Sequence, residues 1–354
     1  MDMQCGGEVR LCAWVHEHEG TNVQKRAGCE CKRTRALGRR RWSGRRRTFV
    51  WEHCGNLGAI HRLFDKPGEG FRMFAMEKER DMATAWREWR DQRDTALAEE
   101  HGWLSLISFT WLSEERSRVA HFPGYWYTDR DEAAGSFRKG TSSTTHSADV
   151  RRNGESFAGE AVFALEDGES DFSLSSGTRV AEVVRRGGRY AVRVRDSSAP
   201  TLLAFQGVPV FDYDPQAVVV GEFIAYDEPR EVAIETARKS VRGRVSLVGE
   251  VEFTYAGEQC RLAVQGRQDD ELTAVFYDLS NGTTTADWRS VTFGGPGGAR
   301  GSVTIDFNRA LNFPSAFTPF GTCPKPPEGN TLQVSVLAGE RRPMPWIDPD
   351  ASAQ

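Results

Sequence analysis

The main body of the chain has few side chains that carry nucleophilic or metal chemistry. Only two of the seven cysteines, Cys260 and Cys323, and three of the seven histidines, His101, His121 and His146, lie beyond residue 81. No HExxH, GxSxG or GxGxxG motif and no metal-ligand spacing occurs there, which argues against the standard classes of enzyme. We therefore expect no metal ion and no cofactor in the body.

Long apolar runs are also lacking. No stretch of eighteen apolar residues and no signal-peptide core occurs, so we expect neither a membrane span nor export. Two cysteines in a large body fit a reducing compartment, and we expect a cytoplasmic protein.

Positive charge is scarce in the body and concentrated before it. Residues 1–81 hold 17 Lys and Arg against 11 Asp and Glu, which leaves 29 against 39 for the remainder. An acidic body argues against nucleic-acid binding by that part of the chain. In the basic segment, residues 32–47 hold nine basic side chains in sixteen positions, a composition typical of disorder.

Three interpretations of residues 1–81 stay open. The first is a disordered extension or a misassigned start, because Met73, Met76 and Met82 could each begin the protein. The second is a basic arm that binds nucleic acid or a membrane surface. The third is a zinc site, although the C-x-C spacing is not the usual one; its ligands would be His16, His18, Cys29 and Cys31.

A helix is predicted over residues 82–101. Its apolar residues recur at helical spacing and include Trp86 and Trp89, so we expect this stripe to pack on the body. Asp81 is expected to cap the start and Gly102 to end the helix.

After the helix the sequence predicts a mainly β fold of antiparallel strands. Short alternating segments are separated by turn signals, among them Gly187-Gly188, Ala256-Gly257 and Asn281-Gly282, which favour hairpins. We expect a sandwich-like unit over 103–200, a barrel-like unit over 205–342 and a disordered tail over 343–354.

A loop of unusual length and composition follows the strand at 303–307. Residues 306–330 are rich in Pro, Asn and Phe, and an alternating segment at 332–336 is expected to close it as a second strand. A connection this long is uncommon in a compact domain unless it is functional or structurally special.

DFNRALNFPSAF, GTCPKPPEGN and AGE in this stretch resemble the C-terminal signature of the DUF1684 family of uncharacterised bacterial and archaeal proteins. Supporting segments are GWLSLISFTWL at 102–112, RRGGRYAVRVRD at 185–196, FDYDP at 211–215 and FYDLSNGTTT at 276–285. The resemblance spans about residues 82–342 and implies no activity. Family members usually have a second loop cysteine where this chain has Ser315.

Cys323 is the first candidate for catalysis. A nucleophilic cysteine needs a base or a positive charge to hold its thiolate, and the base would have to be His101, oriented by Asp306 or Asn330. The alternative is a buried cysteine that packs a proline-rich loop.

Polar side chains of the loop are candidates for ligand binding. Asp306 could act as a base or a metal ligand, Asn308 could donate to a ligand, and Arg309 could clamp a carboxylate or phosphate. Further candidates at the same end are Asn312, Asn330, Asp278 and Arg289. The alternative is that Asn and Asp side chains tie the loop to its own backbone.

Three functions are therefore carried forward. The leading hypothesis is a protein that binds a small molecule through the 306–330 loop. The others are a hydrolase that uses Cys323 or Asp306, and a structural or protein-interaction module. Convergence of Asp306, Asn308, Arg309 and Cys323 on one pocket would favour the first two.

Overall fold

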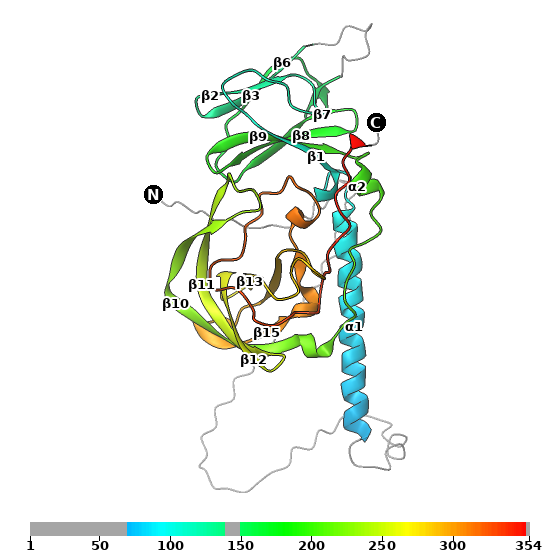
Figure 1. Ribbon diagram of the computed structural model, residues 1–354, viewed down its shortest axis with the longest axis vertical. Helices are drawn as coiled ribbons and strands as arrows, with labels where there is room; N and C mark the ends of the chain where they lie inside the picture. Colours follow the sequence, from blue (N-terminus) through cyan, green and yellow to red (C-terminus); the bar gives the residue numbers. More distant parts are fainter. Residues whose placement is uncertain (1–68, 139–148, 352–354) are drawn as a thin grey trace, which may run out of the picture. The chain divides into compact units, whose positions relative to one another are not determined.

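The computed structural model describes residues 69–138 and 149–351 (Figure 1). The chain divides into two compact units, Met1–Lys78 and Glu79–Gln354. The basic run, the zinc ligands and His146 lie outside the described residues. The described residues belong to the second unit, except 69–78 at the start of the first helix.

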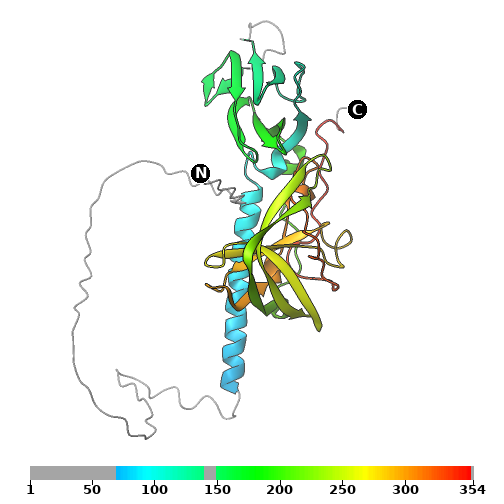
Figure 2. The same ribbon diagram turned by 90° about the vertical axis from the view of Figure 1, so that its left-hand side faces the viewer.

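The helix α1 spans Glu69–Leu97 and is continuous in both ribbon views (Figures 1 and 2). It begins before the predicted start and ends before the predicted end, so Asp81 lies inside the helix and does not cap it. The buried stripe also differs, because Trp86 is buried and Trp89 half-buried, whereas Met82 is exposed. Arg90 joins the stripe at 6% exposure because a buried carboxylate neutralises its charge.

The first β region consists of two antiparallel sheets. One has six strands in the order β1-β9-β8-β7-β4-β5, and the other three in the order β2-β3-β6. A single buried cluster contains side chains of both sheets, for example Trp126 and Phe163 from the small sheet and Val183 and Val192 from the large one. The strands are β1 (Leu106–Trp111), β2 (Tyr125–Asp129), β3 (Glu132–Phe137), β4 (Arg151–Arg152), β5 (Glu155–Ser156), β6 (Gly159–Phe163), β7 (Ser170–Ser176), β8 (Arg179–Arg186) and β9 (Arg189–Asp196).

The turn between β8 and β9 is the predicted two-residue hairpin. Arg186 pairs with Arg189, and Gly187 and Gly188 have φ of 59° and 74°. Two successive positive φ values define the turn whose twist matches the strands, and glycine adopts them without steric cost. This turn sets the register that brings Glu182 opposite Arg193.

A short helix, α2 (Pro200–Leu203), leads into the second β region, an antiparallel sheet of seven strands. Its order is β15-β10-β11-β12-β13-β14-β16, and the long strands β10 and β11 twist strongly in Figure 2. The strands are β10 (Val218–Glu235), β11 (Arg242–Tyr255), β12 (Glu258–Gly266), β13 (Glu271–Phe276), β14 (Arg289–Gly294), β15 (Arg300–Asp306) and β16 (Leu311–Asn312).

This sheet is open, so the predicted barrel-like unit is wrong. Its first and last strands, β15 and β16, are separated by a 3-10 turn at Phe307–Arg309 and are not hydrogen-bonded neighbours. β16 has only two residues and is followed at once by the proline-started turn Pro314–Ala316. Proline donates no backbone hydrogen bond, so the chain cannot continue pairing there.

The predicted closing strand at 332–336 is also wrong, although its apolar residues are buried. Leu332 and Val336 join the main core, but the segment forms no strand. Its backbone bonds to the neighbouring connection, for example Leu332 N to Tyr277 O at 2.8 Å and Leu279 N to Val334 O at 3.1 Å. The alternation of apolar and polar residues therefore predicted burial correctly but not a β-strand.

The hairpin predicted at Asn281-Gly282 is wrong. Phe276 pairs with Arg289, so the connection from β13 to β14 covers 277–288 and is not a tight turn. Asp227-Glu228-Pro229, a sequence typical of turns, lies inside β10, where the register shifts between Ala225 and Arg230. A bulge accommodates the missing donor of the proline.

The segment after Arg342 was expected to be a disordered tail, yet residues 343–351 have defined contacts. Trp346 Nε1 donates to Leu106 O at 3.1 Å, and Ile347 N donates to Thr201 Oγ1 at 2.9 Å. The ring of Trp346 also packs edge-on against Phe320 of the long loop.

Candidate functional site

The start of the long loop is a capped turn. Asp306 Oδ1 accepts hydrogen bonds from Asn308 N at 3.0 Å and from Asn308 Nδ2 at 2.9 Å. Its other carboxylate oxygen lies 3.6 Å from Arg309 Nε. These contacts occupy both carboxylate oxygens within the turn itself.

Asn308 ties this turn to two other parts of the fold. Its amide bonds both backbone groups of Asp214, with Oδ1 accepting at 2.9 Å and Nδ2 donating at 2.8 Å. The backbone carbonyl of Asn308 accepts a hydrogen bond from Trp86 Nε1 at 2.8 Å. Asn308 is 1% exposed. The hydrogen bonds of its side-chain amide therefore hold the fold together and are not directed at a ligand.

Asp278 and Arg289 form a fully buried ion pair at 2.9 Å, with both side chains 0% exposed. Arg289 also donates to the carbonyls of Val336, Ala338 and Glu340. Burial lowers the pKa of Arg289, although the carboxylate of Asp278 acts in the opposite direction. The pair closes the 336–340 segment onto the sheet.

Glu340 is a structural residue that the sequence reasoning missed. It is 0% exposed and accepts from Arg90 at 2.8 Å, from Arg93 at 3.2 Å and from the backbone of Asn312 at 2.7 Å. The amide of Asn312 in turn donates to Arg341 O. The AGE ending of the signature was the available signal, because a glutamate beside apolar core positions requires buried cations.

Asn330 links strands β12 and β13 beyond the point where their backbone pairing ends. Its amide accepts from Ala263 N at 2.9 Å and donates to Ala263 O at 2.8 Å and Val275 O at 2.9 Å. This residue too is satisfied by backbone groups.

Cys323 is 8% exposed and packs with Val275 and Trp288. Burial raises the pKa of its thiol, against opposing hydrogen bonds from Ser315 and the charge of Arg193. The expected partner His101 makes its ring contact with Thr178 O at 3.0 Å. The contacts of the two side chains do not form a Cys–His pair.

The predicted site residues therefore lie in separate hydrogen-bonded or packed groups and do not converge on one pocket. Where the long loop lines a cavity, beside Pro324, Lys325 and Pro327, its volume is about 10 Å³, enough for about one water molecule.

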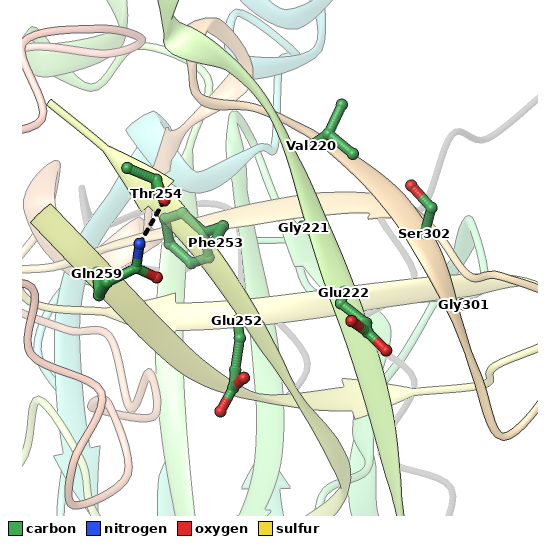
Figure 3. Close-up of a pocket in the computed structure, with 9 residues that line it drawn as sticks. All are labelled: Val220, Gly221, Glu222, Glu252, Phe253, Thr254, Gln259, Gly301 and Ser302. Atoms are coloured by element: carbon green, nitrogen blue, oxygen red, sulfur yellow. Dashed lines mark hydrogen bonds between the residues drawn. The ribbon is translucent and has the colours of Figure 1, made fainter. Parts of the chain in front are cut away.

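A larger groove of about 470 Å³ lies over the sheet face of β10, β11, β12 and β15 (Figure 3). None of the predicted site residues lines it. Glu222 and Glu252 stand opposite each other there, and Gln259 donates to Thr254 at 2.8 Å. The other lining residues are Val220, Gly221, Phe253, Gly301 and Ser302.

Arginines on one face of β9 form the most unusual electrostatic feature. Arg193 and Arg195 are 1% and 4% exposed, and both bond the buried carboxylate of Glu182, at 3.1 Å and 2.7 Å. Burial acts to raise the pKa of Glu182, but the charges of Arg195 and Arg193 hold it below its usual value. One carboxylate therefore serves two guanidinium groups.

Arg238, just after β10, adds a third guanidinium to this cluster. Its group lies 3.9 Å from the ring of Phe109, and that of Arg193 lies 5.8 Å from the same ring. Burial and then the charge of Arg193 lower the pKa of Arg238. Among the side chains described, those of residues 79–138 and 149–351, no carboxylate lies within 4 Å of Arg238.

The long loop reaches both arginines. Arg193 Nη2 donates to Thr322 Oγ1 at 3.0 Å, and Arg238 Nη2 donates to Pro319 O at 3.2 Å. The Nε atoms of Arg193 and Arg238 are buried without a hydrogen-bond partner among the described residues. We call Arg193, Arg238, Phe109 and Thr322 the arginine site.

Arg186 increases the positive charge near this site. Burial and then the charge of Arg193 lower its pKa to about 10. Its hydrogen bonds go to neutral oxygens of Glu169, Arg185 and Ser170. Arg186, Arg193 and Arg195 thus act on the one carboxylate of Glu182, and Asp167 is the other carboxylate that acts on Arg186. With Arg238, four guanidinium groups are balanced by two carboxylates, so the region has a net positive charge.

Two general features complete the description. Within the described residues, no cluster of three or more His, Cys, Asp or Glu side chains is arranged to hold a metal ion. No helix in that part of the chain combines the length and apolar character that a membrane span requires.

Comparison with known proteins gives one family. The model of DUF1684, described as a protein of unknown function, matches residues 203–341. The segments at 102–112 and 185–196 that also resemble the family lie outside this match. No curated protein matches the chain.

A solution NMR structure of an uncharacterised protein from Haloarcula marismortui is similar to part of the chain. The identity is 29%, the TM-score is 0.34, and the match covers 39% of this chain and 77% of that one.

Proposed function

Because residues 203–341 belong to the DUF1684 family, whose description names no activity, we propose from the geometry that the protein binds a small anion at the arginine site. The observation that carries this proposal is the pair of buried, unpartnered Nε donors on Arg193 and Arg238. A buried donor without a partner costs about 1–3 kcal/mol, and more when the group is charged. An anion would satisfy the donors and offset the excess charge together.

The proposal keeps the long loop as part of the site and changes which residues do the binding. Thr322 and Pro319 belong to the loop and fix the two guanidinium groups. Asp306, Asn308 and Arg309 would instead maintain the fold. The two cysteines of the described chain are free and buried, and we propose the reducing cytoplasm as the compartment.

A thermal-shift titration of the full chain tests this function. Sulfate, phosphate and malonate are compared at constant ionic strength, with sodium chloride as the reference. A ligand that binds only the native state at about 100 times its Kd adds about 2.7 kcal/mol of stability. We expect a saturable rise in Tm with at least one of these polyvalent anions.

Substitution of the half-buried Arg238 locates the binding. Arg238→Gln should abolish the rise. Arg300→Gln should retain it, because Arg300 is an exposed arginine paired with Glu222 at 3.1 Å on another part of the sheet. No anion-specific rise in the wild type, or equal rises in both variants, would refute the proposed function.

A further inference from the structure

The arginine site draws its donors from three separate elements. Arg193 comes from β9, Arg238 from the turn after β10, and Thr322 from the long loop. Arg193 Nη1 and Nη2 are bonded to Glu182 and Thr322, and Arg238 Nη2 to Pro319. The Nε of each arginine is buried and has no hydrogen-bond partner among the described residues.

Thr322 can add a hydroxyl donor. Its Oγ1 accepts from Arg193, so its own hydrogen stays available for an anion. A planar carboxylate is matched best by the paired donors of one guanidinium fork. Donors that come from three separate elements can instead bond different oxygens of one tetrahedral group.

The net charge of the arginine site also favours a phosphoryl group. Four arginines, Arg186, Arg193, Arg195 and Arg238, are balanced by two carboxylates, Glu182 and Asp167. A phosphoryl group carries about −1.5 to −2 at neutral pH and three strong acceptor oxygens, so it would compensate more of the excess than a monocarboxylate would.

Exposure limits how large the bound group can be. Arg193 is 1% exposed, which a bilayer or a folded partner could not reach, whereas the half-buried Arg238 and Phe109 leave an approach from solvent. We propose that the ligand of the arginine site is a small molecule recognised by its phosphoryl group. This inference rests on the proposed function and names its ligand class.

Calorimetric titration of the full chain compares groups of equal charge and different shape. Inorganic phosphate and sulfate represent the tetrahedral class, and malonate represents the planar one. Phenyl phosphate is the arm that separates an esterified phosphoryl group from free phosphate. We expect the tetrahedral anions to bind at least about tenfold more tightly than malonate, because a hydrogen bond to a charged group is stronger than one between neutral groups.

Variants of Thr322 and Arg193 test the donors. Thr322→Val should weaken phosphate binding about tenfold, and Thr322→Ser should restore it. Arg193→Lys keeps the charge and removes the Nε donor, so it should also weaken binding; its Tm reports whether the fold survives.

The failures are distinguishable. Malonate binding that equals or exceeds phosphate binding would overturn the ligand class and leave anion binding in place. Absence of binding by all the anions would remove both proposals. Binding of a phosphorylated peptide without binding of phosphate or phenyl phosphate would overturn the small-molecule assignment.

Discussion

Replacing Asp278 with Asn separates a structural role of the buried ion pair from a role in ligand binding. The substitution keeps the shape of the side chain and removes its charge, which leaves Arg289 buried at 0% exposure with only carbonyl partners. Breaking a buried pair by neutralising one member costs about 3–5 kcal/mol, because the remaining charge loses its compensation. We expect Asp278→Asn to lower the free energy of unfolding by that amount.

Urea unfolding followed by circular dichroism and tryptophan fluorescence measures the change. Coincident transitions by the two probes establish that a single free energy applies, and an unchanged slope shows that the loss is one of stability.

Asp269→Asn is the matched control, because Asp269 bonds Arg267 at the same distance, 2.9 Å, with side chains 65% and 73% exposed. An exposed pair contributes about 0–1 kcal/mol. Equal, small losses in both variants would show that the Asp278–Arg289 pair is not a structural tie.

Three other substitutions or reactions test the remaining assignments. Trp86→Ala should cost about 3–5 kcal/mol in urea unfolding, since Trp86 is 8% exposed and bonded to Asn308, whereas Trp89→Ala should cost clearly less; equal losses would contradict the observed stripe. Glu182 has a folded pKa below its ordinary value of 4.5, so its stabilisation is present above about pH 4.5 and is lost as the pH falls through the folded pKa. Wild type should therefore lose stability more steeply than Glu182→Gln in acid, and parallel pH profiles would count against this. Iodoacetamide should label Cys323 more slowly than a free thiol at pH 7, because burial raises its pKa; rapid labelling below pH 7, read by mass spectrometry, would favour the catalytic interpretation.

Local glycine signals predicted the hairpin turns at 187–188 and 256–257 but not the connection over 277–288. Gly187-Gly188 specifies its own turn through backbone freedom, so the hairpin of β8 and β9 is confirmed. The apolar alternation at 332–336 predicted burial correctly. It could not show that the nearest backbone would be the 277–279 connection, which offers hydrogen bonds without a ladder.

The arginine site was not predictable from the sequence because strand alternation suggests the opposite. Val192 and Val194 face the core of the first region, so Arg193 and Arg195, which alternate with them, are expected to face solvent. That face is covered by Trp103 and by the loop residue Thr322, which lies more than a hundred positions away. Burial of a polar face by a distant segment leaves no local pattern.

A crystal structure of the protein with tungstate tests the central claim most directly. Tungstate is a tetrahedral dianion that is located by its anomalous scattering. The proposal predicts a tungsten peak at the site, with the tungstate oxygens within hydrogen-bond distance, about 3 Å between heavy atoms, of the Nε atoms of Arg193 and Arg238 and of Thr322 Oγ1. Water at both Nε atoms, with tungstate bound elsewhere or not at all, would contradict it.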